Sequence, residues 1–302
     1  MADLALFYDN ADWLAPLKRV LDRRGIDTVW IDAAGHRYDP AAIEPPARLV
    51  FNRISMSSFK RTADHPIFYA DALFGAWERA GAKVLNGGEA YAVDHNKARQ
   101  LEIIASLGLD APATRVVRRR EDVVAAAGEV GFPLLVKGNI GGAGAGIDRF
   151  DSADRLDPSL VPDSIDKVWL VQRYHAPRDG HIIRFEFIGD DFVYAIAVDG
   201  GGQFDLCPAD ACLTEPGKPT VTMTRYEPTA EQVDAARRVV RGAGIDVGGC
   251  EALIADDGRL LFYDINAFSN FAANAEELLG FDPHEQLVDR LEAEIAATKE
   301  LA

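Results

Sequence analysis

Cysteine is scarce in this sequence, and no two cysteines stand at the spacing that metal sites use. The 302 residues include three cysteines, at Cys207, Cys212 and Cys250, and no CxxC motif. An odd, low number of cysteines argues against a disulfide framework and against a structural zinc site. Cys207 and Cys212 are close enough in sequence to border one pocket, although ordinary buried thiols are the simpler explanation.

Long apolar runs and a leader segment are absent as well. No run approaches the roughly 20 residues that cross a bilayer. Residues 1–9 read as a strand and lack the basic and apolar regions of a signal peptide. We therefore expect a cytoplasmic protein with no membrane partner.

Positive charge is in deficit. The sequence has 32 Lys and Arg residues against 48 Asp and Glu residues, which gives a formal net charge of -16. Such a surface repels nucleic-acid backbones and anionic lipids, so neither is an expected partner. A few basic side chains gathered in a cleft can still bind an anionic small molecule.

Two common phosphate-binding motifs are missing. The sequence contains no GxxxxGK[ST], which argues against a P-loop. The first expected strand, Leu4 to Asp9, continues into Asn10-Ala11-Asp12, which offers no glycine for a pyrophosphate. A Rossmann-type oxidoreductase is therefore a remote alternative.

The first part of the chain alternates strand-like and helical patterns. This order predicts an open parallel sheet, whose functional loops lie at the carboxyl ends of the strands. Asp9, Asn10, Asn52 and Arg53 fall at those ends. The expected strands are 4–9, 27–32, 48–52 and 83–86, and the expected helices are 13–24 and 67–80.

The second part has a mixed pattern with antiparallel hairpins. The clearest hairpin covers 250–266 and turns at Asp256-Asp257-Gly258. The other expected strands are 113–117, 132–139, 167–175, 181–189 and 191–198, and the expected helices are 94–107, 121–130, 229–243 and 283–299.

A glycine-rich loop is the first candidate for phosphate binding. Lys137 ends an apolar strand, and the loop then carries Gly141, Gly142, Gly144 and Gly146. Glycine lets backbone N–H groups approach a phosphate closely. Because the loop leads into another strand-like run, we interpret it as a flap over a triphosphate. By itself this signal is weak.

The hairpin at 250–266 carries a candidate metal site. Asp264 and Asn266 are two residues apart on one strand, so both project from the same face. Glu251 lies on the partner strand across a short turn. Three oxygen ligands on rigid strands suit Mg²⁺, which shares its coordination with phosphates and water. The alternative is a polar, solvent-facing side of an ordinary hairpin.

Three basic residues complete the candidate set: Lys97, Lys137 and Arg184. A solvated surface charge is the default interpretation for each one alone. Lys137 fits that default least well, because it ends an apolar strand just before the glycine loop. Arg184 shares one face of its strand with Ile182 and Glu186.

In their order, these motifs resemble the RimK-like branch of the ATP-grasp ligases, near glutathione synthetases and amino-acid ligases. The resemblance covers roughly residues 86–270. It rests on NGGEAYAVDHNKARQLEIIASLGLDAPAT, FPLLVKGNIGGAGAGI, VWLVQRYH, GHIIRFEFIGDD and GGCEALIADDGRLLFYDINAFSN. It implies an α/β ATP-grasp fold, α+β in its C-terminal part, after a Rossmann-like domain. The implied domains are 1–92, a lid subdomain at 93–174 and a catalytic subdomain at 175–302.

The resemblance also implies roles for single residues. Lys97 and Lys137 would contact ATP phosphates beneath the glycine loop, and Arg184 would touch phosphate or a developing acyl-phosphate, so that Lys137 and Arg184 act in catalysis. The implied adenine hinge is Gln172, Arg173, Tyr174 and His175. The implied magnesium ligands, for two ions with Mn²⁺ as a substitute, are Glu251, Asp264 and Asn266. The substrate candidates are Asn52, Arg53, Arg225 and Asn270.

Three positions depart from the family pattern. Arg173 stands where an acidic residue is common, which puts the ribose contact in doubt. Ile182 replaces the Asp of GxDIR, which alters the surroundings of Arg184. Asp264 stands where many relatives have Glu, and it is still a hard oxygen ligand. None of these changes removes a group that the chemistry requires.

The resemblance predicts an ATP-dependent ligase that joins a carboxylate to an amine through an acyl-phosphate, with release of ADP and phosphate. An ATP-grasp kinase and a non-catalytic ATP-binding protein are the alternatives. The expected substrates are an amino acid, a small peptide or a related carboxylate, and the sequence does not identify them. Homo-oligomers are frequent in this family, which makes one possible here.

Overall fold

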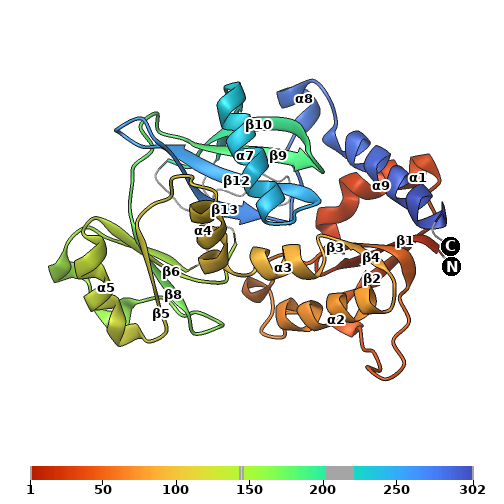
Figure 1. Cartoon of the computed structure of the whole chain (residues 1–302), viewed down its shortest axis with the longest axis horizontal. Helices are drawn as coiled ribbons and strands as arrows, with labels where there is room; N and C mark the ends of the chain where they lie inside the picture. The colour runs from red at the N-terminus through yellow and green to blue at the C-terminus, as the bar shows by residue number, and fades with distance from the viewer. Residues whose placement is uncertain (1, 143, 145, 202–220, 301–302) are drawn as a thin grey trace.

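The structure, a computed structural model, describes residues 2–142, 144, 146–201 and 221–300, and it contains three sheets (Figure 1). Cys207 and Cys212 lie outside the described residues. The N-terminal sheet has four parallel strands, the middle sheet four antiparallel strands and the C-terminal sheet five antiparallel strands. In the view of Figure 1 they occupy the right, the left and the top of the molecule.

The N-terminal sheet confirms the predicted parallel arrangement. Its order is β2 (Thr28–Asp32), β1 (Ala2–Tyr8), β3 (Ala47–Arg53) and β4 (Lys83–Leu85). Successive side chains of a strand point to opposite faces. Leu4 and Leu6 therefore pack with α1 (Ala15–Arg24) and with the last helix, α9 (Pro283–Glu300). Ala5 and Phe7 pack on the other face with α2 (Ile67–Arg79).

The middle sheet has one covered face and one face toward a cavity. Its order is β5 (Thr114–Val117), β8 (Trp169–Arg173), β6 (Leu134–Gly138) and β7 (Ile147–Phe150). Helix α5 (Val123–Val130) packs on Leu134, Val136 and Val171. The alternate residues Leu135 and Lys137 are left to line the cavity.

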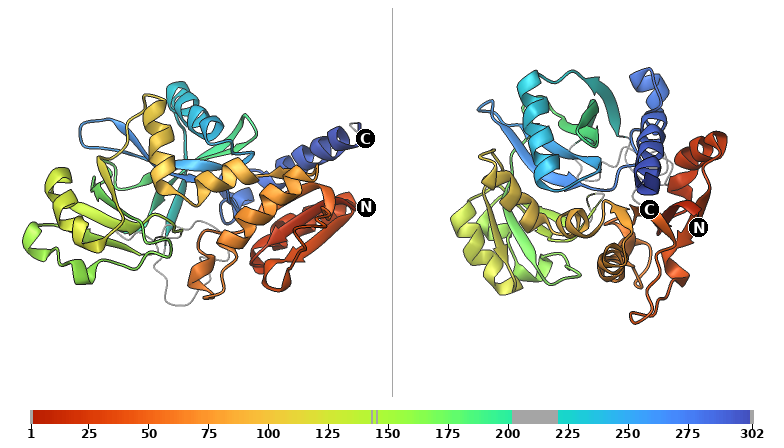
Figure 2. Two further views of the ribbon diagram at one scale, coloured as in Figure 1. Left: turned by 60° about the horizontal axis from the view of Figure 1, so that its bottom comes forward. Right: turned by 45° about the vertical axis from the view of Figure 1, so that its right-hand side comes forward.

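The C-terminal sheet carries the hairpin predicted at 250–266. Its order is β11 (Thr222–Tyr226), β10 (Asp191–Asp199), β9 (Ile182–Ile188), β12 (Val247–Ile254) and β13 (Leu260–Asn266). Helices α4 (Lys97–Ser106) and α7 (Ala230–Gly242) cover the face that holds Ile183 and Phe185 (Figure 2). Thr229 and Gln232 form a capping box at the start of α7, which begins as predicted at the first residues of the segment 229–243.

One expected helix is divided in two. The segment expected as a single helix over 94–107 contains the end of α3 (Gly88–Asp94) and all of α4. Asn96 has an extended backbone, and its side chain accepts a hydrogen bond from the backbone N–H of Arg99. Asn competes well for this capping position, which ends one helix and starts the next.

The remaining elements are short. A small helix, α8 (Ala275–Leu279), precedes α9. No helix in the described ranges combines the length and the apolar composition needed to span a bilayer. Short 3-10 turns cover Asp12–Leu14, Ala33–Gly35, Ser58–Lys60, Arg120–Asp122, Ala153–Arg155 and Pro158–Leu160.

Candidate functional site

A cavity of about 260 Å³ is bordered by residues of the middle and C-terminal sheets and by residues that follow β1 and β3 of the N-terminal sheet. Trp13 and Ser55 contribute from the N-terminal part, Lys137 from the middle sheet and Arg184 from the C-terminal sheet. Segments far apart in the sequence therefore meet at one place. The predicted residues that line this cavity are Lys97, Lys137, Gly141, Gly142, Gly144, Gln172, Arg173, Tyr174, His175, Arg184, Glu251, Asp264, Asn266 and Asn270.

Three charged residues stand side by side across three strands. Arg184 on β9 is directly opposite Glu251 on β12, and Glu251 is directly opposite Asp264 on β13. The Arg184 Nη1 atom donates to Glu251 Oε1 at 3.3 Å. Lys97, the first residue of α4, brings its ammonium group onto Asp264 Oδ1. The strand register therefore produces a row of alternating charges on the cavity wall.

A bulge in β13 shapes the acidic part of this row. Glu251 faces Asp264, but the next residue, Ala252, faces Phe262. Tyr263 is therefore an extra residue in the ladder, as in a β-bulge. As a result Tyr263 joins Asp264 and Asn266 in lining the cavity. The pattern of alternation in the sequence gave no sign of this bulge.

The two carboxylates form a site that suits a divalent cation. Burial raises the pKa of Glu251, and the negative charge of Asp264 raises it further. A cation between them would relieve that repulsion. The Nδ2 atom of Asn266 is buried and has no hydrogen-bond partner among the described residues, so no hydrogen bond from Nδ2 holds this amide in place. Among the described residues no three His, Cys, Asp or Glu side chains gather as a metal site, so this candidate rests on two carboxylates and an amide.

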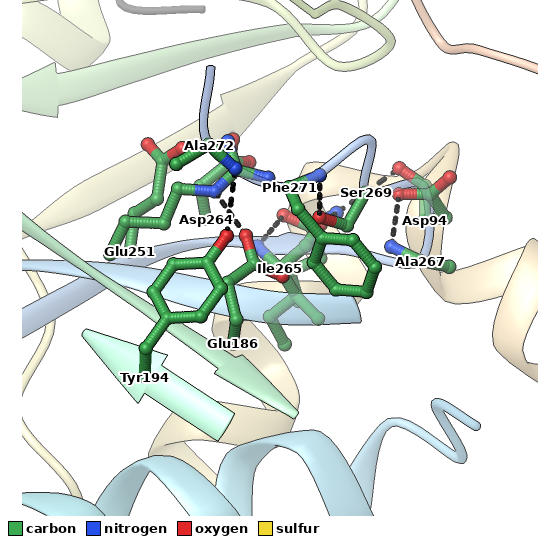
Figure 3. A network of polar contacts seen from close by, with 12 residues as sticks. Asp94, Glu186, Tyr194, Glu251, Asp264, Ile265, Ala267, Ser269, Phe271 and Ala272 are labelled. Carbon is green, nitrogen blue, oxygen red and sulfur yellow. Dashed lines mark hydrogen bonds and ion pairs between the residues drawn. The ribbon is translucent and has the colours of Figure 1, made fainter. Parts of the chain in front are cut away.

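Arg184 is held by a second carboxylate, that of Glu186. The Arg184 Nε atom donates to Glu186 Oε1 at 2.5 Å, and Glu186 has no exposed surface. Burial alone would disfavour the charged guanidinium, but the charges of Glu186 and Glu251 outweigh it and raise the pKa of Arg184. Arg184 therefore stays cationic and is fixed in direction by two acceptors. Figure 3 shows Glu186 below Asp264, and β12 separates their two strands in the sheet.

Lys137 is the most buried cation of the predicted phosphate site. It is 4% exposed, and its ammonium lies 6.0 Å from the centre of the Tyr263 ring. Burial, followed by the positive charge of Lys97, lowers the pKa of Lys137 to about 8. Two ammonium groups that repel each other in a cavity favour the binding of a polyanion.

The predicted adenine hinge has its side chains engaged with the middle sheet. Gln172 donates to Thr114 Oγ1 at 2.9 Å, and the Arg173 guanidinium donates to the carbonyl of Phe132. Arg149 lies over the Tyr174 ring at 4.2 Å. The Arg173 side chain is thus occupied outside the hinge, although the residue borders the cavity.

Several predicted substrate residues have structural contacts instead of a place on the cavity wall. Asn52 bonds the carbonyl of Asn86 and the N–H of Ile54. Arg225 on β11 pairs with Glu227 at 2.6 Å. Four of the predicted site residues in the described ranges do not border the cavity: Asn52, Arg53, Arg225 and Gly146.

Arg53 fastens the N-terminal sheet to the loop after β13. Its Nη2 atom donates to the carbonyl of Ser269 at 2.8 Å and to Asn270 Oδ1 at 2.5 Å. Its guanidinium carbon lies 4.3 Å from the centre of the Phe268 ring, which in turn lies 5.6 Å from Trp13. The cavity is bordered by Phe268, Trp13 and Asn270 but not by Arg53. Arg53 therefore supports the cavity wall through its contacts with Phe268 and Asn270.

Sequence reasoning did not single out two carboxylates near the site. Glu186 was placed on the face of Arg184, but its burial as an ion-pair partner was not foreseen. Asp94 ends α3 and lines the cavity at 6% exposure. Burial raises the pKa of Asp94 to about 7. Its position close before Lys97 is the one signal that could have drawn attention to it.

A comparison with protein families decides the assignment. The model of the RimK-like ATP-grasp domain matches residues 94–291. The chain belongs to the RimK-like ATP-grasp family. This match confirms the resemblance inferred from the five sequence segments, and it includes the three strands that carry the charged row.

Curated relatives of this ATP-grasp protein are named as ligases and synthases. The ribosomal protein bS6–L-glutamate ligase of Escherichia fergusonii is 27% identical over 209 residues, which is 66% of this chain and 64% of that protein. The N-terminal section of the carbamoyl phosphate synthase large chain of Aquifex aeolicus is 28% identical over 220 residues. That match covers 68% of this chain and 38% of the relative. The chain thus spans less than two thirds of either relative.

Solved structures confirm the ATP-grasp fold over nearly the whole chain. The D-alanine–D-alanine ligase of Bacillus anthracis has a TM-score of 0.71 at 15% identity and covers 99% of both chains. The ATP-grasp ligase PsnB with a minimal precursor has a TM-score of 0.68 at 19% identity and covers 97% of this chain and 99% of its own. One structure of PsnB contains Mg and ADP.

Proposed function

We propose that this chain is an ATP-dependent ligase that joins a carboxylate to an amine through an acyl-phosphate, with release of ADP and phosphate. One observation carries the proposal. Lys97, Lys137 and Arg184 meet Glu251 and Asp264 in a single cavity. This arrangement supports a site that combines cations for a triphosphate with oxygen ligands for its magnesium.

The residues of the cavity have separable roles in this proposal. MgATP would supply the phosphoryl group that turns the carboxylate into an electrophile. Lys97 and Lys137 neutralise phosphate charge, and Arg184 stabilises the charge that develops on the phosphoryl group and the acyl oxygen. The proposed magnesium ligands, for two ions, are Glu251, Asp264 and Asn266. Such a site accelerates the reaction chiefly through positioning and charge.

Water must be kept from an acyl-phosphate, because hydrolysis would waste it. The glycine loop beyond Lys137 is suited to this task, since Gly141, Gly142 and Gly144 border the cavity. Gly144 has φ 66°, a conformation that other residues adopt with strain. We assign to this loop the closure of the site over the phosphates.

The proposed carboxylate is that of an amino acid or a small peptide. The named action of the bS6–L-glutamate ligase, which joins an amino acid to a protein, supports this class. Trp13, Ser55 and Phe268 border the end of the cavity next to the N-terminal sheet, and we place the organic substrates there.

For the domain organisation we propose the same three units as from the sequence: 1–92, 93–174 and 175–302.

Replacement of the proposed magnesium ligands tests the function. We expect Asp264→Ala and Asn266→Ala each to lower amide formation at least roughly 100-fold, because transition-state charge loses its stabilisation. Asp257→Ala, at the exposed turn of the same hairpin, is the matched control and should keep full activity. Product formation is measured with ADP and free phosphate. Full turnover in both ligand variants would refute the metal assignment.

Stoichiometry separates the ligase from a kinase. A ligase releases free phosphate for each amide bond that it forms and for each ADP. A kinase leaves the phosphate on its product, whatever amine is present. ADP and a stable phosphorylated product, without free phosphate, would therefore overturn the proposal.

A further inference from the structure

A carboxylate that belongs to none of the roles above lies on the cavity wall. Asp94 is the last residue of α3, and it is 6% exposed. Its Oδ1 atom accepts a hydrogen bond from the backbone N–H of Ala267 at 3.0 Å (Figure 3). Its Oδ2 atom is buried and has no hydrogen-bond partner in the described part of the chain.

The structural role of Asp94 explains only one of its two oxygens. The bond to Ala267 fixes the start of the loop that follows Asn266, and a neutral Asn side chain could accept that bond equally well. A buried carboxylate oxygen without a partner is unfavourable, and such atoms in a folded protein call for an explanation. A ligand that donates to Oδ2 would supply the missing hydrogen bond.

The neighbouring cations Lys97 and Arg184 do not donate a hydrogen bond to Asp94 Oδ2. Lys97 lies close enough to stabilise the Asp94 charge, but its ammonium contacts Asp264 Oδ1. Arg184 donates its hydrogen bonds to Glu186 and Glu251. Asp94 therefore remains an acceptor with spare capacity beside the row of charges.

The position of Asp94 matches the side from which an acceptor would approach. Its partner Ala267 stands between Asn266, a proposed magnesium ligand, and Phe268, at the end of the cavity next to the N-terminal sheet. An amine that attacks an activated carboxylate must lie beyond the phosphate and metal groups. A primary amine is also a cation at neutral pH and requires an anionic partner in a site rich in Lys and Arg.

We propose that Asp94 binds the ammonium group of the acceptor amine through its free Oδ2 atom. This inference rests on the proposed ligase function and names one part of its acceptor subsite. The role assigned to Asp94 is binding and orientation. Charge-assisted hydrogen bonds of this kind are the strong ones, and they give direction as well as affinity.

A comparison of two nucleophiles that differ in charge, hydroxylamine and an amino acid, distinguishes binding of the ammonium group by Asp94 from the other steps of the reaction. Hydroxylamine is largely uncharged at neutral pH and captures an acyl-phosphate as a hydroxamate, so it does not need an ammonium anchor. The common L-amino acids are offered one at a time as carboxylates with hydroxylamine and ATP. The carboxylate that reacts is then paired with L-amino acids as amine acceptors, and KM is measured for each acceptor.

The test variant is Asp94→Asn, which keeps the size of the side chain and the acceptor for Ala267. We expect the KM for the amine to rise roughly 10- to 100-fold, as loss of a charge-assisted hydrogen bond predicts. Hydroxamate formation should stay within about twofold of wild type, since it bypasses the anchor. Asp94→Glu, which retains the charge, should recover part of the amine affinity.

Asp257→Asn is the control, because Asp257 is half-exposed at the turn of the hairpin and does not border the cavity. It should leave the KM for the amine unchanged. An unchanged KM for the amine in Asp94→Asn overturns the inference, and so does an equal loss of both reactions in Asp94→Asn. If the wild type forms no ATP-dependent hydroxamate with any carboxylate, the ligase proposal fails and the role of Asp94 fails with it.

Discussion

Lys137 carries a positive charge at a deeply buried position, and burial disfavours that charge. It is 4% exposed, and burial together with Lys97 lowers its pKa to about 8. A bound phosphate would compensate this ammonium. We therefore expect Lys137→Met to weaken ADP binding roughly 10- to 100-fold, the loss expected for a charge-assisted contact. The fold should remain intact, because Met is of similar length and is favoured at a buried site.

Isothermal titration with ADP and magnesium measures this effect. Lys167→Met is the control, since the Lys167 side chain is 69% exposed and does not border the cavity. The control should bind ADP like the wild type. Equal ADP affinity in Lys137→Met and in the wild type would remove Lys137 from the phosphate site.

Asp94 predicts an unusual dependence of stability on pH. Burial raises its pKa from 3.8 to about 7, so the folded protein holds a proton that the unfolded chain releases. Between about pH 4 and pH 7 the folded state binds more protons, and stability falls as the pH rises. In Asp94→Asn this penalty is absent. The variant should gain thermal stability relative to the wild type across that window, by at most a few kcal/mol at pH 8.

Thermal melts of both proteins at pH 5 and pH 8 measure the difference. The advantage of Asp94→Asn should be larger at pH 8 than at pH 5, because the wild-type carboxyl ionises in between. A difference that is equal at the two pH values would show that Asp94 has an ordinary pKa in the folded protein.

Some residue roles were accessible from the sequence and others were not. The i and i+2 spacing of Asp264 and Asn266 placed both on one face, and the cavity confirms that placement. Asn52 and Arg53 were predicted at strand ends, which is where β3 has them. Their hydrogen bonds to Asn86 and Ser269 depend on segments far away in the chain, and no local pattern reports such partners.

At the scale of elements, the charged row depends on how closely β12 approaches its neighbours. A Cβ atom at Gly249 would lie 1.9 Å from the carbonyl oxygen of Phe185 on β9. Glu251, which pairs with Arg184 and Asp264, is two residues further along the same strand. The absence of a side chain at position 249 therefore sets the spacing of the strands that carry the site.

We expect Gly249→Ala to destabilise the protein by roughly 1–3 kcal/mol, the range for overpacking a tight interior, and to lower activity as well. Gly128→Ala in α5 is the control, because a Cβ atom there has no neighbour within 4 Å. The control should be neutral or stabilising by up to about 1 kcal/mol, since Ala favours a helix. Urea unfolding measures both. Equal stability of the two variants would contradict the close approach.

Strand and helix positions were largely predictable because burial imposes a period. A strand that is covered on both faces needs a nearly continuous run of buried residues, and such runs are found in β1, β3 and β9. The break at His95 and Asn96 was missed, because α3 and α4 together continue an apolar helical pattern. The bulge at Tyr263 was missed for a related reason, since one extra residue in a ladder leaves the composition of the strand unchanged.

At the scale of the whole molecule, the last helix joins the two ends of the chain. Leu287, Val288 and Leu291 of α9 share a core with Leu4 and Leu6 of β1. Figure 1 shows α9 beside α1 at the N-terminal sheet, and both views of Figure 2 place the first and last elements on the same side. The sequence predicted this helix but not its partner, because its apolar stripe fits any apolar face.

We expect Leu291→Ala to lower the free energy of unfolding by about 2–5 kcal/mol, as for other large-to-small changes in a core. Because this core includes residues of both the N-terminal and the C-terminal sheets, the two should still unfold in one transition. Leu160→Ala is the control, since Leu160 is 61% exposed and should change stability little. Calorimetry measures both. A separate early transition of the N-terminal sheet would contradict a shared core.

The contact of Arg53 with Ser269 and Asn270 has a consequence for chimeric proteins that combine segments of two relatives. The N-terminal sheet supplies the guanidinium, whereas the C-terminal half supplies the loop whose Ser269 carbonyl and Asn270 side chain accept its hydrogen bonds. A chimera that kept residues 86–300 and took its first segment from a relative would need a basic side chain at the end of the equivalent third strand. Without it, this loop would lose those hydrogen bonds even though every proposed ATP and magnesium contact was inherited intact.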